Sequence, residues 1–431
     1  MQKATAKWRL FAVFGSIAVL SYGGDSMNAL ASSNSNINVN KRPVITGVEH
    51  VVLHKGTNTY CGHPRQCVFQ YFGGGEMIVG HNHAPCNYAT NQDVAHDFGG
   101  YHSRSQVLVQ RSLDGGKTWP ENLNVVVWDE TMPDEWKKAF LHPEDPKRED
   151  YDMFKPSSCF FFGRTYLSGN GVTKTCFSLR SDDKGKTWEK TPTIISEPSG
   201  KTGGVHKDCH PIVKMRDGKT LLAAMSLPDC VGVYSSTNNG LSWEYLSAPA
   251  TNDTAKTGRY TYAGLLLLPD NELQCYVLNI TYERNYNNIN GNTNAICMTA
   301  SRDNGKTWGP LKPIVGKGDA CWKEFKRHAG GGWHYRSPWP ILLKDGRILV
   351  VFARRHFPFG IGGVVSADNG RTWSDEFVIR ADDASCDDLG YPVGSQLDDG
   401  SVFIAYYYND AGTKESLKAV RYIAGTIFRL E

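Results

Sequence analysis

The chain has no long run of either charge and no apolar run of membrane-spanning length. Its 431 residues carry a formal net charge of only +3, so nothing indicates nucleic acid or an anionic membrane as a partner. No stretch reaches the 18 or more apolar residues of a transmembrane helix. Stable insertion into a membrane is therefore not expected.

Two common short motifs are also missing. The 11 cysteines include no Cys-x-x-Cys pair, which argues against a zinc knuckle or a redox dithiol. Their odd number leaves at least one thiol unpaired, and Cys61 and Cys67 are the nearest pair. Gly-Lys-Thr occurs at Gly116, Gly185 and Gly305, but none has the glycine five residues earlier that a phosphate-binding loop needs. The sequence predicts no metal and no cofactor.

The N-terminus has the three-part layout of a secretory signal peptide. Three basic residues precede the apolar stretch Leu10–Leu20, and a short small-residue sequence begins at Ala29. This predicts a signal peptide over residues 1–31, a linker over 32–43, one domain over 44–431, and a secreted or periplasmic protein. A membrane anchor is the alternative, because the polar stretch before Ala29 is long for a signal peptide.

One eight-letter pattern, Ser-x-Asp-x-Gly-x-Thr-Trp, occurs five times, and its starts lie 69, 55, 65 and 65 residues apart. Only the third copy is degraded, with Asn238 for Asp and Ser242 for Thr. Asp bonds its own backbone in turns, Gly supplies positive φ and Trp fills an apolar slot, so the pattern predicts a stapled hairpin turn. The copies are Ser112–Trp119, Ser181–Trp188, Ser236–Trp243, Ser301–Trp308 and Ser366–Trp373.

A second repeat consists of an apolar run, a turn containing Gly or Asn, and another apolar run. It occurs six times, at Val68–Gly75, Phe160–Gly163, Ile212–Gly218, Leu265–Asn271, Ile341–Gly346 and Val393–Gly400. Each unit predicts two strands and a tight turn, and a period of this size suits a propeller blade. We therefore expect an all-β, six-bladed β-propeller, in which Ala419–Leu430 and Val44–Leu53 close the ring.

Ligands of a propeller bind where the innermost strands begin. The residues just before each apolar run are polar, charged or aromatic, which predicts a binding funnel. They are Arg65, Gln66, Lys155, Asp208, His210, Tyr260, Tyr262, Arg336, Ser337, Asp388 and Tyr391.

With the five repeats, the six blades and Arg65, the chain resembles the sialidase (neuraminidase) superfamily over about Val44–Leu430, and the eight-letter pattern matches that superfamily's Asp box, or BNR repeat. The resemblance implies an exo-glycosidase that releases a terminal acidic sugar from a glycan. In that family arginines hold the sugar carboxylate, a tyrosine is the nucleophile and an aspartate is the acid/base; a guanidinium suits a carboxylate, and a neutral tyrosine is not repelled by it.

Individual family roles fall on four positions here. Arg65 follows Pro64 before the first apolar run, and Tyr391 opens the last blade. Arg354 and Arg355 both precede the last box, and Arg355 is preferred because Arg354 continues the alternation of the strand. The acid/base position lies on the loop that contains Asp93 and Asp97, and Asp97 fits it better. The resemblance thus implies Tyr391 and Asp97 as catalytic residues and Arg65 and Arg355 as substrate-binding residues.

The chain departs from the family pattern at two positions. The glutamate that partners the tyrosine belongs at the start of the fourth blade, where this chain has Arg259-Tyr260-Thr261-Tyr262. The second arginine has only Arg284 as a nearby candidate. Without the glutamate, the charge that activates Tyr391 is missing.

Histidines supply a rival mechanism, since a neutral imidazole is the usual general base near pH 7. The candidates are His81, His83, His96, His102, His206 and His210. A site that combines Tyr262 with either His83 or His210 would resemble that of propeller-fold lyases and glycosidases that act at uronic acids. Three hypotheses stay open: a sialidase-type glycosidase, such a histidine-based enzyme, and a carbohydrate-binding propeller without catalysis.

Overall fold

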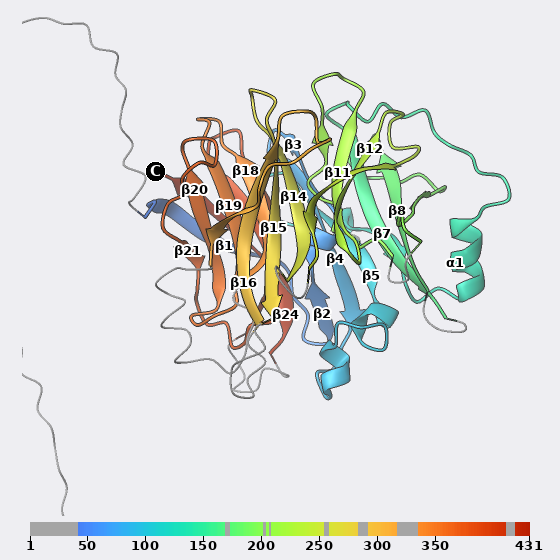
Figure 1. Cartoon of the computed structure of the whole chain (residues 1–431). Coiled ribbons are helices and arrows are strands. Elements are labelled where there is room, and N and C mark those ends of the chain that lie inside the picture. Colours follow the sequence, from blue (N-terminus) through green and yellow to red (C-terminus); the bar gives the residue numbers. More distant parts are fainter. Residues whose placement is uncertain are drawn as a thin grey trace, which may run out of the picture. The chain divides into compact units, whose positions relative to one another are not determined.

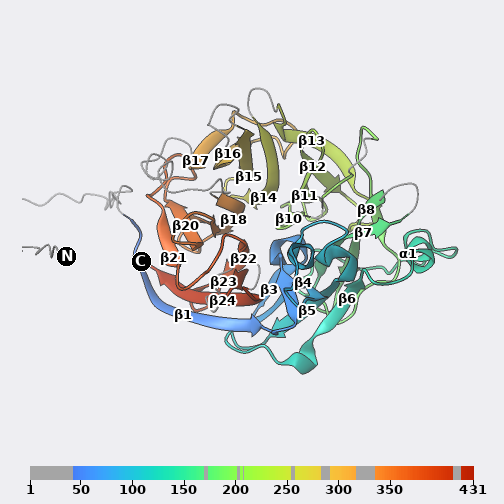
Figure 2. The same cartoon turned by 90° about the horizontal axis from the view of Figure 1, so that it is seen from below.

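The computed structural model describes residues 42–168, 173–200, 204–206, 208–253, 258–282, 292–316, 335–410 and 419–431. The predicted signal peptide and most of the predicted linker lie outside these residues, as do Arg284 and Cys321. Within them, six antiparallel sheets are arranged around a central axis (Figures 1 and 2). The predicted six-bladed, all-β propeller is confirmed.

The first three sheets follow each other along the chain. The first contains β2 (Thr59–Gly62), β3 (Phe69–Gly73), β4 (Glu76–Pro85), β5 (Gln106–Ser112) and β6 (Val125–Asp129). The second contains β7 (Cys159–Leu167), β8 (Thr173–Ser181) and β9 (Thr193–Ile195). The third contains β10 (Val213–Lys214), β11 (Leu221–Ser226), β12 (Cys230–Ser236) and β13 (Glu244–Thr251).

The other three sheets have four strands each. The fourth contains β14 (Arg259–Leu267), β15 (Leu273–Tyr282), β16 (Asn292–Ser301) and β17 (Lys312–Val315). The fifth contains β18 (Tyr335–Leu342), β19 (Ile348–Arg354), β20 (Gly360–Ser366) and β21 (Phe377–Arg380). The sixth contains β22 (Gly390–Gln396), β23 (Val402–Asn409), β24 (Arg421–Leu430) and β1 (Ile45–His54).

Helices are few and short. The α-helix α1 (Asp134–Leu141) packs on the outer side of the second sheet, against β7. The 3₁₀ helices are η1 (Pro64–Gln66), η2 (Asn91–Val94), η3 (Tyr101–Arg104) and η4 (Glu121–Leu123). No helix in the described part of the chain is long and apolar enough to span a membrane.

The ring closes as the sequence predicts. Strand β1, from the start of the domain, pairs antiparallel with β24, from its end, with Ile45 opposite Leu430. Figure 2 shows β1 as the outer strand of the sheet that otherwise consists of the last three strands. The N-terminal strand is thus hydrogen-bonded into the last blade, and the chain that continues from β1 into β2 connects that blade to the first.

The five Asp boxes form the stapled turns that their composition predicts. In the second box, Asp183 accepts hydrogen bonds from Ser181 Oγ at 2.8 Å and from the Thr187 backbone N–H at 2.9 Å. Gly185 has a φ of 76°, which only glycine adopts without strain. Each box connects the last two strands of its blade, and antiparallel pairing puts it at the end of the propeller opposite the starts of β14, β18 and β22.

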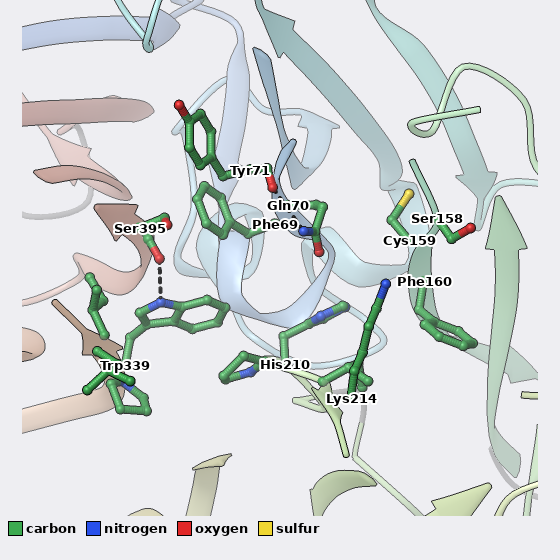
Figure 3. A pocket seen from close by; sticks show the side chains of 16 residues that line it. Phe69, Gln70, Tyr71, Ser158, Cys159, Phe160, His210, Lys214, Trp339 and Ser395 are labelled. Carbon is green, nitrogen blue, oxygen red and sulfur yellow. Dashed lines mark hydrogen bonds between the residues drawn. The ribbon is translucent and has the colours of Figure 1, made fainter. Parts of the chain in front are cut away.

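That opposite half of the axis contains a cavity of about 280 Å³. Its walls come from the later parts of inner strands, such as Ile341 and Ser395, together with His210 and Lys214 (Figure 3). The hydrophobic core surrounds the axis in the sheets themselves, where Phe352, for example, is completely buried. The cavity is therefore separate from the end of the axis where β14, β18 and β22 begin.

Candidate functional site

Three inner strands share one local device where they begin. The pairing register slips between Thr261 and Gly264 in β14, between Arg336 and Trp339 in β18, and between Gly390 and Val393 in β22. At each slip a residue other than glycine takes a positive φ, as Tyr262 does at 55° and Tyr391 at 53°. Such bulges re-aim side chains next to functional sites, and the strained backbone is kept only where packing enforces it.

The bulges bring two tyrosine hydroxyls together under an arginine. Tyr391 donates a hydrogen bond of 2.7 Å to the hydroxyl of Tyr262. Arg336 donates from Nε to the Tyr391 hydroxyl at 3.3 Å and from Nη2 to the Tyr262 hydroxyl at 3.2 Å. Burial opposes the charge of Arg336, but the two phenols outweigh it and raise the pKa of the guanidinium. Burial raises the pKa of the Tyr262 phenol, which keeps it protonated near pH 7.

A second group of polar side chains, from the fifth and last blades, lies beside this cluster. Arg355 donates to the carbonyl of Leu389 and, from Nη2 at 2.7 Å, to the hydroxyl of Tyr407. Tyr407 in turn donates to Asp388 at 2.7 Å, and Arg421 donates to the other oxygen of that carboxylate at 2.9 Å. Burial alone would raise the pKa of Asp388, but His96 and the arginines hold it well below its usual range.

Two histidines approach the tyrosines from the first blade. The ring of His63 stands edge-on to Tyr391 with the centroids 4.5 Å apart, and its Nδ1 lies 3.0 Å from the Tyr101 hydroxyl. Complete burial, with His96 close by, lowers the pKa of His63 well below its usual range. His96 is more exposed; its Nε2 lies 3.0 Å from the Tyr60 hydroxyl and 3.4 Å from an Asp388 oxygen.

A third histidine lies beside Tyr262. The ring of His206 is 5.8 Å from the Tyr262 ring, and its Nδ1 is 3.1 Å from Asp208. Burial would raise the pKa of Asp208, yet His206 and the hydroxyl of Ser226 hold it at about 2. Asp208 is therefore ionised near neutral pH.

The site combines positive charge, phenols and imidazoles. Among the described residues no carboxylate is hydrogen-bonded to the Tyr391 hydroxyl; Tyr262 stands in the position where the family glutamate was expected. The arrangement can bind an anionic group through Arg336 and can move a proton between two phenols. The site residues named here include no set of soft ligands arranged around a metal.

A family model described as a BNR repeat-like domain matches residues 164–404, which is more than half of the chain. The chain belongs to this family. The sialidase-like BNR-repeat propeller inferred from the boxes is thereby confirmed. No match was found among curated proteins.

Solved structures with the same fold share little sequence with this BNR repeat-like protein. A protein of unknown function from Dyadobacter fermentans is 20% identical, with a TM-score of 0.60, over 90% of this chain and 100% of that one. NanB sialidase from Streptococcus pneumoniae is 12% identical, with a TM-score of 0.52, over 88% and 71%. An α-L-arabinanase from Penicillium chrysogenum is 13% identical, with a TM-score of 0.51, over 90% and 98%. Such identities establish the fold alone.

The BNR repeat-like fold places Arg65 beneath the site rather than in it. Its side chain is completely buried, and its guanidinium donates to the carbonyls of Pro338 at 2.6 Å, Tyr262 at 3.1 Å and Ala263. Burial lowers its pKa to about 10. Arg65 thus links the inner strands of the fourth and fifth blades through their main-chain oxygens. This geometry does not support the predicted role of Arg65 in binding a carboxylate.

Of four other predicted site residues, some lie at the site and others lie away from it. Arg355 lies beside Tyr391, 5.9 Å from the ring centre. Asp97 is on the exposed loop next to His96 and accepts hydrogen bonds from the Gly100 backbone N–H at 2.7 Å and from Gln92 at 3.2 Å. His210 lines the cavity at the opposite end of the axis, and His83 contacts His54 instead of Tyr391.

Sequence reasoning missed three members of the site. His63 stands only two residues before Arg65, but a histidine ahead of a predicted turn has no distinctive pattern. Tyr407 and Arg421 belong to β23 and β24, whose apolar strand pattern hides single polar positions. Only the pairing of these strands shows that both side chains converge on Asp388.

Proposed function

We propose that this chain is a glycosidase that removes a terminal acidic sugar, of the sialic acid type, from glycans. The single observation that carries the proposal is the hydrogen-bonded pair Tyr391–Tyr262 under Arg336 at the start of three inner strands. Arg336 matches a sugar carboxylate in charge and in fork geometry. A phenol can attack a sugar that carries a negative charge without being repelled by it.

In this mechanism the Tyr391 oxygen forms a bond to the anomeric carbon as the glycosidic C–O bond breaks. Its proton passes to the Tyr262 hydroxyl, whose own proton leaves through His206, 5.8 Å away ring to ring. His96 protonates the departing glycosidic oxygen, since its imidazole lies on the exposed loop and is held by Tyr60 and Asp388. Water then attacks the anomeric carbon and gives a proton back to His96, while the departing Tyr391 oxygen recovers its proton from His206 through Tyr262.

The experiment is hydrolysis of a fluorogenic sialoside by the purified protein. We expect release of the fluorophore by the wild type and a loss of at least about 100-fold in kcat for Tyr391→Phe. Tyr234→Phe is the matched control, because Tyr234 is an equally buried tyrosine of the third blade that donates to the Ser196 carbonyl. His96→Gln and Asp97→Asn compare the two candidate acids on the same loop. Equal rates for wild type and Tyr391→Phe would refute the mechanism.

A second candidate is a lyase or glycosidase that acts at uronic acids through a histidine base. It is favoured by His63 and His206, which flank the tyrosine pair at 4.5 and 5.8 Å between ring centres, while no carboxylate among the described residues bonds Tyr391. Uronate-rich polysaccharides should then yield the ultraviolet absorbance of an unsaturated uronate, and His206→Gln should abolish it. Binding of acidic glycans without any turnover would instead indicate a carbohydrate-binding propeller.

We also propose that the protein is exported. The support is the basic, apolar and small-residue order of residues 1–31. N-terminal sequencing of the protein recovered from the medium or periplasm tests this, with cleavage after about residue 31 expected. A retained N-terminus in a membrane fraction would favour the anchor.

A further inference from the structure

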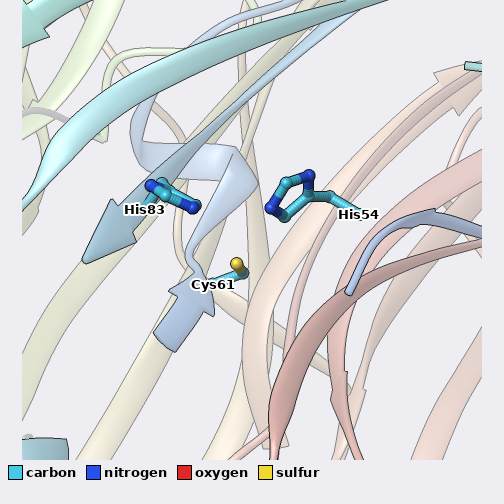
Figure 4. Close-up of side chains that lie close together, drawn as sticks. All are labelled: His54, Cys61 and His83. Carbon is cyan, nitrogen blue, oxygen red and sulfur yellow. The ribbon is translucent and has the colours of Figure 1, made fainter. Parts of the chain in front are cut away.

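Three side chains with metal-binding atoms meet where the ring is closed. His54 ends β1 of the last blade, whereas Cys61 in β2 and His83 in β4 are paired residues of the first blade. The three side chains are turned toward one another (Figure 4). Their nearest ligand atoms, a ring nitrogen from each histidine and the Cys61 sulfur, all lie within 4.8 Å of one another.

These three side chains are little engaged by the rest of the protein. The buried Cys61 thiol makes only a weak contact of 3.7 Å to Thr59 Oγ1. The rings of His54 and His83 stand edge-to-face with their centres 5.1 Å apart. A neutral imidazole offers one ring nitrogen with a free electron pair to a metal ion.

We propose that His54, Cys61 and His83 bind Zn²⁺, with water as the fourth ligand. One thiolate and two imidazoles are the donors that zinc prefers, and a set without carboxylates disfavours Ca²⁺ and Mg²⁺. Zn–N bonds of about 2.0 Å and Zn–S bonds of about 2.3 Å place tetrahedral ligands roughly 3.3–3.6 Å apart. Side-chain rotation of the two half-buried histidines would move their ligand atoms by about 1 Å, which brings the three ligand atoms to these separations. The thiol proton passes to solvent as the Zn–S bond forms.

The neighbouring His81 is close to the three side chains but is not available as a ligand. Its ring is 5.5 Å from that of His54, but both of its nitrogens are occupied, one by the Asn82 carbonyl and one by Gln110, each at 3.1 Å. His81 is therefore not a ligand, and it supports the strand that presents His83.

The position of the site indicates what the metal does. It would join β1 to β2 and β4, and so tie the last blade to the first in addition to the chain that continues from β1 into β2. Cys61 is two residues before His63, whose ring contacts Tyr391. The ion would thus hold both the ring closure and the backbone that presents one histidine of the candidate site.

Calorimetric titration of tag-free, chelator-treated protein with Zn²⁺ tests the proposal. We expect one ion per chain, and a Kd at least about 100-fold weaker in Cys61→Ser and in His83→Gln, since even outer partners of a metal site cost 10- to 100-fold. Co²⁺ should give a thiolate charge-transfer band that Cys61→Ser lacks. Zn²⁺ at about 100 times Kd should raise the wild-type Tm by roughly 5 °C.

Two matched controls keep the test specific. Cys230→Ser changes a partly exposed cysteine of the third blade, and His50→Gln changes another histidine of β1; both should bind Zn²⁺ like the wild type. If circular dichroism shows that Cys61→Ser is unfolded, the half-buried His83→Gln decides. Absence of stoichiometric Zn²⁺ binding, or unchanged affinity in a folded Cys61→Ser or His83→Gln, overturns the proposal.

Discussion

The hydroxyl of Tyr391 donates a 2.7 Å hydrogen bond to the hydroxyl of Tyr262, 129 positions earlier in the chain. Each tyrosine takes a positive φ at the same bulge of its own inner strand. Two bulky residues in this strained conformation, aimed at one another, indicate that the packing of the blades maintains the pair. The proposed chemistry depends on this pair.

Removal of one hydroxyl should separate catalysis from binding. Tyr262→Phe keeps the ring against Arg336 but takes away the acceptor of the Tyr391 proton, so kcat should fall by about 100-fold or more with little change in KM. Steady-state kinetics on the fluorogenic sialoside measure this. A KM rise without loss of kcat would assign Tyr262 to binding alone.

Arg336 should determine the preference for an acidic sugar. Its guanidinium bonds both phenols at 3.2–3.3 Å, and a charged hydrogen bond to a ligand contributes about 1.5–3 kcal/mol. Arg336→Gln should raise KM about 10- to 100-fold for a sugar with a carboxylate. The neutral methyl ester of the same substrate is the control, and its KM should change far less. Equal losses on both substrates would contradict a carboxylate-binding role.

Replacing Arg65 should lower the stability of the fold rather than weaken substrate binding alone. Arg65→Met leaves the carbonyls of Pro338, Tyr262 and Ala263 without their donor in a buried place. Each such loss costs about 1–3 kcal/mol, so the free energy of unfolding should fall by at least about 3 kcal/mol. Urea unfolding measures it. Wild-type stability with a raised KM would instead support the carboxylate-binding role that the family resemblance implies.

Acid should destabilise the protein through buried histidines. Burial lowers the pKa of His81 to about 3, whereas an unfolded chain takes up this proton near pH 6.5. Between these values only the unfolded state is protonated, so stability is complete above pH 6.5 and falls as the pH decreases. At pH 5 His81 should account for a loss of about 2 kcal/mol.

Urea unfolding at pH 7 and pH 5 checks this for the wild type and His81→Gln. The variant should lose about 2 kcal/mol less over this interval, although its stability at pH 7 is lower. His142→Gln, at an exposed position, is the control and should follow the wild type. The same pH dependence in His81→Gln and wild type would exclude His81 as a source.

The Asp boxes should affect stability without affecting catalysis. Asp183→Ala removes the acceptor of four hydrogen bonds, from Ser181, Lys186 and Thr187, in a partly exposed turn. We expect a loss of about 1 kcal/mol and an unchanged kcat/KM, because the boxes lie at the end of the propeller opposite the tyrosine pair. A large fall in kcat/KM of the folded variant would show that the turn communicates with the site.

Much of the fold could be predicted because propeller blades are local. The turns at Ser181–Trp188 and its counterparts are determined by neighbouring residues, and continuous apolar runs such as the one in Ile348–Arg354 indicate buried strands. The pairing of β1 with β24 was also predictable, since a six-blade count left two unpaired strands at the two ends.

The site was predictable only in part. Position before an apolar run correctly brought together Tyr262, Arg336 and Tyr391, because every blade begins at the same end of the axis. The same rule misplaced His210, which faces the cavity at the other end, because a register position does not tell which way a side chain turns.

What the sequence determined by itself is the repeated unit: the turn chemistry of the boxes, the strand pattern, the number of blades and the ring closure. These depend on residues close together in the chain or on simple counting. Only the tertiary structure shows that Tyr262 is hydrogen-bonded to Tyr391, that Arg65 is buried against carbonyls, and that His54, Cys61 and His83 converge. The reason is physical: bulges and blade packing orient side chains through contacts between residues far apart in the sequence, and no local pattern encodes those contacts.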